Sequence, residues 1–200
     1  MKIRCDLDVE VIGLELYELE VTPPREDFEL EVKRATTVAL SGDVPPLDRA
    51  RELYRRFGTD PTRMRPSSEA LLRRIKKGES LPRINSLVDV ANALSVQFQV
   101  PVGLYDLGKV AGEELVIRLG RDGESYEGIG KEKVNVDGRI CVADTKGPCG
   151  NPSGDSARTM ITTATESAAW IYYLPVRDED IDRTAELIAV FGRGLVRMIQ

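Results

Sequence analysis

The sequence predicts a mixed α+β (α/β) protein in which strands come first, helices follow and strands return. Three observations carry this prediction. Apolar residues stand among glutamates in VIGLELYELEV at 11–21. Between 47 and 98 apolar residues recur at helical spacing instead. From 100 onward, short apolar runs return between glycines and prolines. A chain of 200 residues is long enough for one core, so we expect a single domain over 1–200.

The N-terminal portion, residues 1–44, is predicted to be β-rich. VIGLELYELEV has the composition of a strand with one solvated face. The segment ATTVALSG at 35–42 is short and β-branched, which favours a second strand.

Two amphipathic helices are expected next. The first ends before Gly58, and its apolar stripe is Leu47, Ala50, Tyr54 and Phe57. After a loop at 59–66, we expect Ser67 or Ser68 to cap the second helix, which Gly78 ends.

A third helix is predicted to begin near Asn85 or Ser86. Its core stripe is Leu87, Ala91, Leu94 and Phe98. Asn85, Asp89 and Asn92 fall on the opposite side, either as a solvated face or as the polar lining of a site. The spacing alone favours the solvated face.

Strands return after this helix. LVIRLG at 115–120 and GRICVADTKG at 138–147 alternate or end in turns, and SAAWIYYLPV at 167–176 is apolar enough for a central strand. The tail, 176–200, is predicted to be a C-terminal helix that Gly192 and Gly194 can break.

The composition limits the chemistry that the chain can perform. It contains no histidine, so a Ser-His-Asp or Cys-His mechanism is excluded. Its three cysteines lack CxxC spacing, so we expect neither disulfides nor a metal site, and no cofactor. Cys141 is expected to be buried, and Cys149, in a loop-like stretch, is the one thiol placed to react. No membrane span or export segment is recognisable, so a cytoplasmic protein is predicted.

Positive charge is concentrated in one block. Residues 1–48 carry a net charge of −7, residues 49–83 carry +7 and residues 84–200 carry −5. Two adjacent basic helices with a basic loop between them match the needs of a phosphate backbone. We therefore predict that a nucleic-acid backbone is the partner of eight residues, and the family resemblance described below implies that it is tRNA rather than DNA: Arg55, Arg56, Arg63, Arg65, Arg73, Arg74, Lys76 and Lys77.

The segment GPCGNPSGDSARTMITTAT at 147–165 gathers polar groups among turn-forming residues. It is either a surface loop or a loop that grips a polar ligand with amides, hydroxyls and one arginine. The sequence leaves both interpretations open. The polar residues in question are Asn151, Asp155, Ser156, Arg158, Thr159 and Thr162.

Several segments together resemble a known family. RINSLVDVANAL at 83–94, VPVGLYDLGKVAG at 100–112 and CVADTKGP at 141–148 are similar, in order and spacing, to motifs of the B3/B4 domain. That domain belongs to the β subunit of bacterial-type phenylalanyl-tRNA synthetase and also occurs in freestanding proteins, which RPSSEALLRRI at 65–75 resembles more closely. The resemblance covers about 45–175 and implies a mixed α/β fold with an unusual β-sandwich.

The resemblance also implies an activity, the hydrolysis of a wrongly attached amino acid from tRNA. Arg83 and Asn92 match polar residues near the family's editing pocket, whereas the family's threonine, histidine and glutamate fall on Ala91, Gly103 and near Trp170. An aminoacyl ester is already activated, so water, an oriented carboxylate and hydroxyl or amide donors can suffice. The catalytic residues are therefore predicted to be Asn92, Asp155, Ser156 and Thr159, and the substrate-binding residues Arg83, Asn85, Asn151 and Arg158.

The leading hypothesis is thus a freestanding B3/B4 protein that performs trans-editing of misacylated tRNA. Asp155 would help to orient the attacking water or would instead bind the α-ammonium group of the substrate. One alternative is a non-catalytic tRNA-binding module that associates with an aminoacyl-tRNA synthetase. A second alternative is an amino-acid-binding protein with no affinity for RNA.

Overall fold

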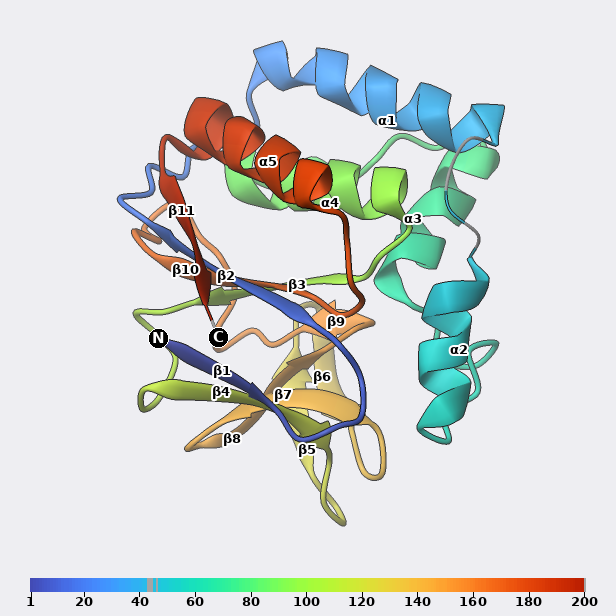
Figure 1. Ribbon diagram of the computed structural model, residues 1–200, viewed down its shortest axis with the longest axis vertical. Coiled ribbons are helices and arrows are strands. Elements are labelled where there is room, and N and C mark those ends of the chain that lie inside the picture. Colours follow the sequence, from blue (N-terminus) through green and yellow to red (C-terminus); the bar gives the residue numbers. More distant parts are fainter. Residues whose placement is uncertain (43–44, 46, 200) are drawn as a thin grey trace.

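The computed structural model describes residues 1–42, 45 and 47–199. Two β-sheets lie beneath a layer of helices, with two further helices along one side (Figure 1). The predicted mixed α+β class is confirmed, and between residues 47 and 172 helices are followed by strands as expected. The N-terminal portion differs from the prediction because it contains a long helix.

The upper sheet is antiparallel and has the order β11–β2–β10–β3. Its strands are β2 (Ile12–Tyr17), β3 (Val102–Asp106), β10 (Ala168–Tyr172) and β11 (Leu195–Ile199). β10 lies between β2 and β3, so the prediction of a central strand is confirmed. Every residue of β10 is buried, because one face meets the helices and the other meets the second sheet.

The lower sheet has the order β1–β4–β7–β8–β9, in which only the β1–β4 pair is parallel. Its strands are β1 (Lys2–Cys5), β4 (Glu114–Leu119), β7 (Ile140–Asp144), β8 (Gly147–Asn151) and β9 (Gly154–Asp155). A separate hairpin joins β5 (Ser125–Gly128) to β6 (Lys131–Asn135). β9 is the last strand of this sheet and lies beside β3 of the upper sheet, so it sits where the two sheets meet.

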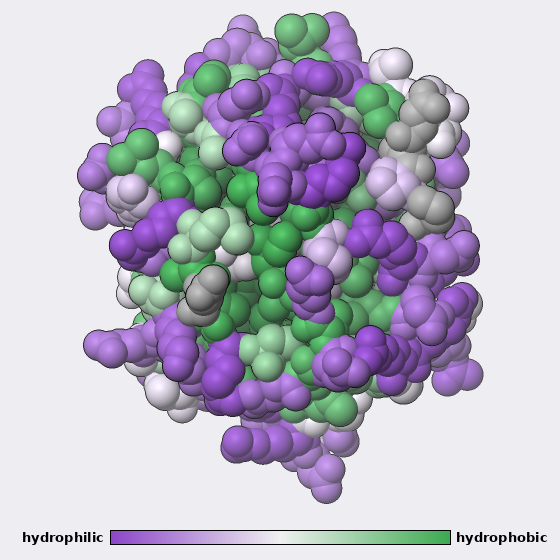
Figure 2. Space-filling model, in the orientation of Figure 1, coloured by the Kyte–Doolittle hydropathy of each residue, from purple (hydrophilic) through white to green (hydrophobic). Residues whose placement is uncertain are grey.

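Helices cover the upper sheet and flank both sheets. The cover consists of α1 (Glu29–Ser41), which follows the short 3-10 helix η1 (Glu26–Phe28), and of α4 (Ser86–Phe98) and α5 (Asp178–Leu187). The flanking helices are α2 (Asp48–Arg56) and α3 (Ser67–Lys76). Figure 2 shows apolar side chains gathered across the middle of the same face, with polar residues around them. None of the helices in the described part of the chain is both long enough and apolar enough to cross a membrane.

The prediction of a strand at 35–42 is wrong, since most of this segment belongs to α1. Val32, Ala35 and Ala39 are the buried residues of that helix, which packs against α4. Their spacing of three and four positions is helical and outweighs the β-branched threonines. Gly42 ends the helix with a φ of 82°. Asp43, Val44 and Pro46 lie outside the described residues.

The tail is a helix only in its first part. α5 continues into the π-helix η2 (Ile188–Gly192), after which the chain reverses at Arg193, with a φ of 50°, and enters β11. At Gly194 a Cβ would lie 2.5 Å from Leu19 Cδ2 and 3.0 Å from the Tyr17 carbonyl oxygen, so a larger residue would require Leu19 to shift. Pairing of β11 with β2 therefore replaces the helix predicted for the end of the chain.

The helix starts agree with the predictions only in part. Asn85 caps α4, because its side chain accepts a hydrogen bond from the Val88 amide at 2.9 Å. The cap predicted for α3 is wrong, since Pro66 precedes the helix and neither Ser67 nor Ser68 forms a side-chain hydrogen bond with the described residues.

The polar side of α4 is not a solvated face, so the interpretation that spacing favoured is also wrong. Asn85 and Asp89 are 4% and 2% exposed. Asp89 accepts hydrogen bonds from Arg83 Nε at 2.7 Å and from the Ile84 amide at 2.7 Å. A buried carboxylate needs such partners, so this part of the face stabilises the helix start.

Candidate functional site

The short strand β9 is held in place by the turn before it. Asn151 Oδ1 accepts a hydrogen bond from the Ser153 amide at 2.8 Å, and Ser153 Oγ bonds to the Arg65 carbonyl at 2.8 Å. Tyr126 Oη donates to the Gly154 carbonyl at 2.6 Å. These contacts tie the turn to the α2–α3 connection and to the hairpin, so they position Asp155 with little freedom.

Two hollows in the protein surface meet at Gly154 and Asp155, which line both. The smaller one, which we call the small pocket, has a volume of about 90 Å³ and lies between α3, α4 and β3. The larger one, which we call the outer pocket, has a volume of about 530 Å³ and lies between the α2–α3 connection, α3 and the β5–β6 hairpin.

The small pocket combines apolar walls with polar groups that have no protein partner. Ser67 Oγ is buried and forms no hydrogen bond within the described residues. Asn92 is half-buried, and its side-chain amide likewise makes no hydrogen bond to any residue that the structure describes. An unpaired polar group costs free energy when it is removed from water. The apolar walls are Leu71, Val88, Ala91, Val102 and Leu104.

Asp155 is the charged group of the small pocket. Burial raises the pKa of its carboxyl from 3.8 to about 7, although a hydrogen bond from the Leu104 backbone lowers it slightly. Within the described residues, no lysine or arginine forms an ion pair with it. A carboxyl group that changes charge near neutral pH is suited to general acid–base chemistry.

The outer pocket contains cationic and amide groups. Arg63 and Arg65 line it, and the Arg63 side chain is 90% exposed with one ion pair, to Asp60 at 3.7 Å. Asn151 also lines it and is 2% exposed, and its Nδ2 has no partner among the described residues. Arginines together with a free amide donor form a surface that suits phosphate and nucleotide groups.

Some of the predicted catalytic residues lie outside both pockets. Ser156 is 1% exposed, and its Oγ accepts a hydrogen bond from the Arg158 amide at 3.0 Å. Thr159 is fully buried, and its Oγ1 donates to the Cys149 carbonyl at 3.2 Å. Both hydroxyls are therefore engaged in holding the segment after β9. Asn92 and Asp155 are the predicted catalytic pair that the fold brings together.

The predicted substrate-binding residues are distributed similarly. Arg158 forms two hydrogen bonds with Asp144, at 2.7 and 3.0 Å. Arg83 binds Asp89 and Glu29, on the far side of α4 from the small pocket's lining residues. Asn85 caps α4, and its Nδ2 reaches the Ile161 carbonyl at 3.4 Å. Of the four predicted binding residues, only Asn151 lines a pocket that contains Asp155.

The expectation for Cys149 is wrong. This residue lies within β8 rather than in a loop and is fully buried. Burial raises the pKa of its thiol to about 12, so the thiolate is scarce at neutral pH. Cys141 is buried, as predicted.

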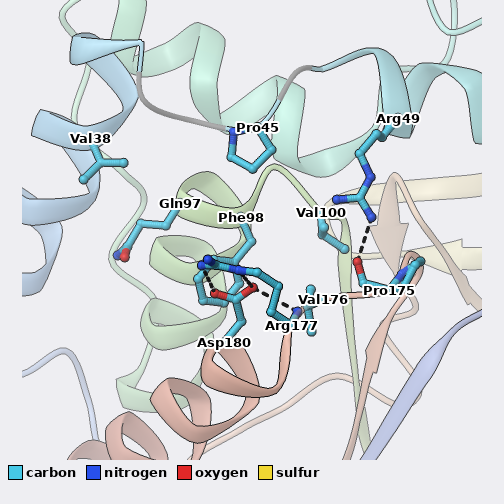
Figure 3. A pocket seen from close by; sticks show the side chains of 10 residues that line it. All are labelled: Val38, Pro45, Arg49, Gln97, Phe98, Val100, Pro175, Val176, Arg177 and Asp180. Carbon is cyan, nitrogen blue, oxygen red and sulfur yellow. Dashed lines mark hydrogen bonds and ion pairs between the residues drawn. The ribbon is translucent and has the colours of Figure 1, made fainter.

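A hollow of larger volume than these two lies elsewhere in the described part of the chain, between α1, α2, α4 and the start of α5 (Figure 3). Its volume is about 760 Å³, but its charged groups already have partners. Arg49 Nη2 donates to the Pro175 carbonyl at 2.7 Å, and Arg177 pairs with Asp180 at 2.8 Å. None of the residues predicted for a site lines it. We therefore place the candidate site at Asp155.

Known proteins of similar sequence show the family to which this chain belongs. The family model of the B3/4 domain matches residues 49–189. This chain belongs to the B3/4 domain family. The match covers more than half of the chain and includes α3, α4 and β9, which contribute residues to the two pockets.

The curated relatives of this B3/4 domain include two phenylalanine–tRNA ligase β subunits. That of Rhodopseudomonas palustris is 35% identical over 113 residues, which are 52% of this chain and 14% of the relative. That of Protochlamydia amoebophila is 31% identical over 83 residues, or 41% of this chain and 10% of the relative. The chain thus matches only a small part of the length of either relative.

A solved structure has the same fold. It is an N-terminal fragment of the phenylalanyl-tRNA synthetase β subunit from Pyrococcus horikoshii, with a TM-score of 0.53. The alignment covers 99% of this chain and 50% of the fragment. At 11% sequence identity, this similarity establishes the fold of the B3/4 domain and nothing about its substrate.

The structure explains why this B3/4 domain has glycine at position 103. A Cβ there would lie 2.8 Å from Tyr105 Oη and 2.9 Å from Tyr173 Oη. These two hydroxyls form a buried hydrogen bond of 2.6 Å with each other, so they occupy the space of any larger side chain. Residues 103 and 105 share one face of β3, which the strand period could have indicated, but the approach of Tyr173 depends on the tertiary fold.

The eight basic residues of this B3/4 domain do not form one patch. Arg55, Arg56, Arg63 and Arg65 lie at the end of α2 and in the following connection, and Arg73, Arg74, Lys76 and Lys77 lie at the opposite end of α3. Acidic residues partly neutralise the first group, for example Asp8 at Arg56 and Glu69 at Arg65. Glu69 is only 2% exposed and also binds Arg51 at 2.8 Å. Only the first group supplies residues to the outer pocket.

Proposed function

We propose that this B3/4 domain hydrolyses the ester of misacylated aminoacyl-tRNA, with the amino acid in the small pocket and the terminal nucleotide of the tRNA in the outer pocket. The observation that carries the proposal is the position of Asp155 on the boundary between these two pockets. The bond to be cleaved joins an amino acid to a ribose, so it would lie at this boundary. Relatives that are phenylalanine–tRNA ligase β subunits support a substrate of this class.

Each group in the site has a chemical role in the proposed reaction. The ionised carboxylate of Asp155 accepts a proton from a water molecule, and the water oxygen forms a bond to the ester carbonyl carbon. The carbonyl oxygen becomes an oxyanion, and the amide of Asn92 donates a hydrogen bond to it. The bond from carbon to the ribose oxygen then breaks, and this oxygen takes the proton back from Asp155. The products are the free amino acid and a tRNA with its hydroxyl restored.

The revised roles differ from those predicted from the sequence. Asn92 and Asp155 keep the proposed catalytic roles, and Asn151 keeps a role in binding. Ser156, Thr159 and Arg158 hold the segment that follows Asp155, and Arg83 and Asn85 hold the start of α4. The RNA backbone would pass the outer pocket at Arg63 and Arg65.

The direct test measures loss of the ester. Total tRNA is charged separately with each amino acid and with near-cognate mispairs, and the release of amino acid is followed with and without the protein. We expect selective release from one group of charged tRNAs. If tRNA binds in a salt-dependent way but no ester is lost, the domain is a binding module and the proposed reaction is wrong.

We predict that Asn92→Ala lowers the single-turnover rate of ester hydrolysis by about a hundredfold. Loss of one oxyanion donor typically costs two to three orders of magnitude. Asn135→Ala is a matched control, because Asn135 is exposed and outside both pockets. Equal losses of hydrolysis rate in the two variants would show that Asn92 has no role in the reaction.

We predict that Arg63→Ala weakens tRNA binding and makes it less sensitive to salt. Each lost phosphate contact lowers the log–log slope of affinity against salt concentration by about 0.7 to 1. The measurement is a set of binding titrations between about 50 and 200 mM salt. Lys76→Ala, at the opposite end of α3, is the comparison and should leave the slope unchanged. A flat wild-type salt dependence would contradict a phosphate-binding role for this arginine.

A further inference from the structure

The small pocket is too narrow for an aromatic side chain. Its volume is about 90 Å³. An engineered protein cavity of about 150 Å³ is filled by one benzene molecule, and a water molecule in the liquid takes about 30 Å³. On this scale the pocket holds about three non-hydrogen atoms. The side chains of alanine, serine, threonine and valine are of this size or smaller.

The walls of the pocket have little room to move. Ala91 is 6% exposed and Leu104 is 4% exposed, and both belong to the main hydrophobic core. Val102 and Leu104 lie on β3, which is paired along its length with the central strand β10. Packed interiors do not expand by a ring's volume without strain, so the size limit follows from the core itself.

The polar groups determine how a substrate enters the pocket. Asp155 and Asn92 require the charged or polar part of an aminoacyl ester, its α-amino group or its carbonyl, to lie beside them. The side chain then points to the apolar walls. Ser95 Oγ is already bonded to the Val100 carbonyl at 2.8 Å, whereas Ser67 Oγ has no partner among the described residues. Ser67 Oγ has almost no accessible surface, so the apolar walls set the limit on side-chain size.

We propose that the substrates are aminoacyl-tRNAs whose amino acid has a small side chain, of about three non-hydrogen atoms or fewer. This inference rests on the proposed hydrolysis and deepens it, because it names the substrate class. Leu71 and Ala91 then determine which side chains fit. Leu71 limits the width of the pocket, and the small side chain of Ala91 leaves space for the substrate.

The test compares rates on five charged tRNAs, carrying alanine, serine, valine, phenylalanine or tyrosine. We expect the small amino acids to be released at least about a hundredfold faster than the two aromatic ones, because a misfit of even one methylene group can cost that much. Release of phenylalanine or tyrosine at a similar rate would overturn the inference while leaving the hydrolase function intact.

Two variants make the test specific to the pocket. Leu71→Ala enlarges it and should raise the rate for phenylalanine relative to alanine at least about tenfold. Leu30→Ala removes an exposed leucine of α1, which is 73% exposed, and should leave the ratio unchanged. If Leu71→Ala does not fold, Val88→Ala enlarges the same pocket from α4. An unchanged ratio in a folded enlarging variant would overturn the inference.

A binding measurement separates this inference from the function on which it rests. The probes are adenosines that carry alanine or phenylalanine through a 3′-amide, which the protein cannot hydrolyse as an ester. If every charged tRNA is stable, the proposed hydrolysis is wrong. Preferential binding of the alanyl probe would still support the size limit, and equal, reversed or absent binding would overturn it.

Discussion

Asp155→Asn is expected to lower the rate of aminoacyl-ester hydrolysis by about two to four orders of magnitude, which is the usual contribution of a general base. Asparagine keeps the shape of the side chain but cannot accept the proton of the attacking water. The measurement is single-turnover release of amino acid at pH 8. Asp122→Asn is the matched control, because Asp122 is an exposed aspartate outside both pockets. Equal activity of wild type and Asp155→Asn would exclude the proposed mechanism.

The pH dependence of the hydrolysis rate should show the titration of the Asp155 carboxyl group. Because the pKa of Asp155 is about 7, the wild-type rate should rise with pH up to about 7 and level off above it. The carboxylate is the active form, so protonation below this pKa removes the base. The residual rate of Asp155→Asn should lack this step.

The same substitution should stabilise the protein at alkaline pH. The pKa of Asp155 is raised in the folded state, so the folded protein binds this proton more tightly than the unfolded chain does. The contribution to stability is present in full below the unfolded pKa of about 4 and is lost as the pH rises to about 7. Denaturant titrations should therefore show that the free energy of unfolding of Asp155→Asn rises relative to that of the wild type over this pH interval. The difference should be on the order of a few kcal/mol above pH 7. A destabilised variant would contradict a raised pKa of this carboxyl group.

Arg158→Ala is expected to destabilise the fold by about 3 kcal/mol, the usual cost of leaving one member of a buried ion pair alone. The side chain of Asp144 is fully buried, and that of Arg158 is 31% exposed. Burial raises the pKa of Asp144, but hydrogen bonds from Arg158 and from two backbone amides outweigh this effect and lower it. Urea denaturation measures the loss, and activity per folded molecule should change little.

A control and a pH measurement test the cause. Arg121→Ala removes an exposed arginine and should change the free energy of unfolding by less than about 0.5 kcal/mol. The lowered pKa of Asp144 means that the ion pair stabilises the protein above the unfolded pKa of about 4, and that this stabilisation is lost as the pH falls below it. If Arg158→Ala folds normally but loses substrate binding, the arginine acts as first predicted from the sequence.

Much of the fold could be predicted from local patterns. The start of α4 near Asn85, the stop at Gly58 and the central strand β10 each depend on residues close together in the chain, and each prediction agrees with the structure. The helix α1 was missed because two threonines and a valine outweighed a weak stripe of alanines in the interpretation of 35–42. The strand β11 was missed because its partner, β2, lies at the other end of the sequence.

The candidate site could be predicted only as a set of residue types. Ser156, Thr159 and Arg158 have the chemistry of a site, and nothing in their spacing shows that the Cys149 carbonyl and Asp144 already bind two of them. The sequence predicts Ser67 as a helix cap, yet its hydroxyl is buried without a partner among the described residues, and the residue lines the small pocket. Whether a polar side chain is already hydrogen-bonded depends on partners from other elements of the fold, so the sequence alone does not show it.

The mixed α+β class, the family, the absence of histidine chemistry and the uneven distribution of charge can all be read from the amino-acid sequence. These properties depend on composition, local spacing and the order of motifs. The packed fold, by contrast, brings Asn92 on α4 and Asp155 on β9 to one pocket, sets the small volume of this pocket and places Arg63 and Arg65 at the neighbouring one. Volume, burial and a shifted pKa are set by groups distant in the chain, which meet only when the two sheets and the helices pack together.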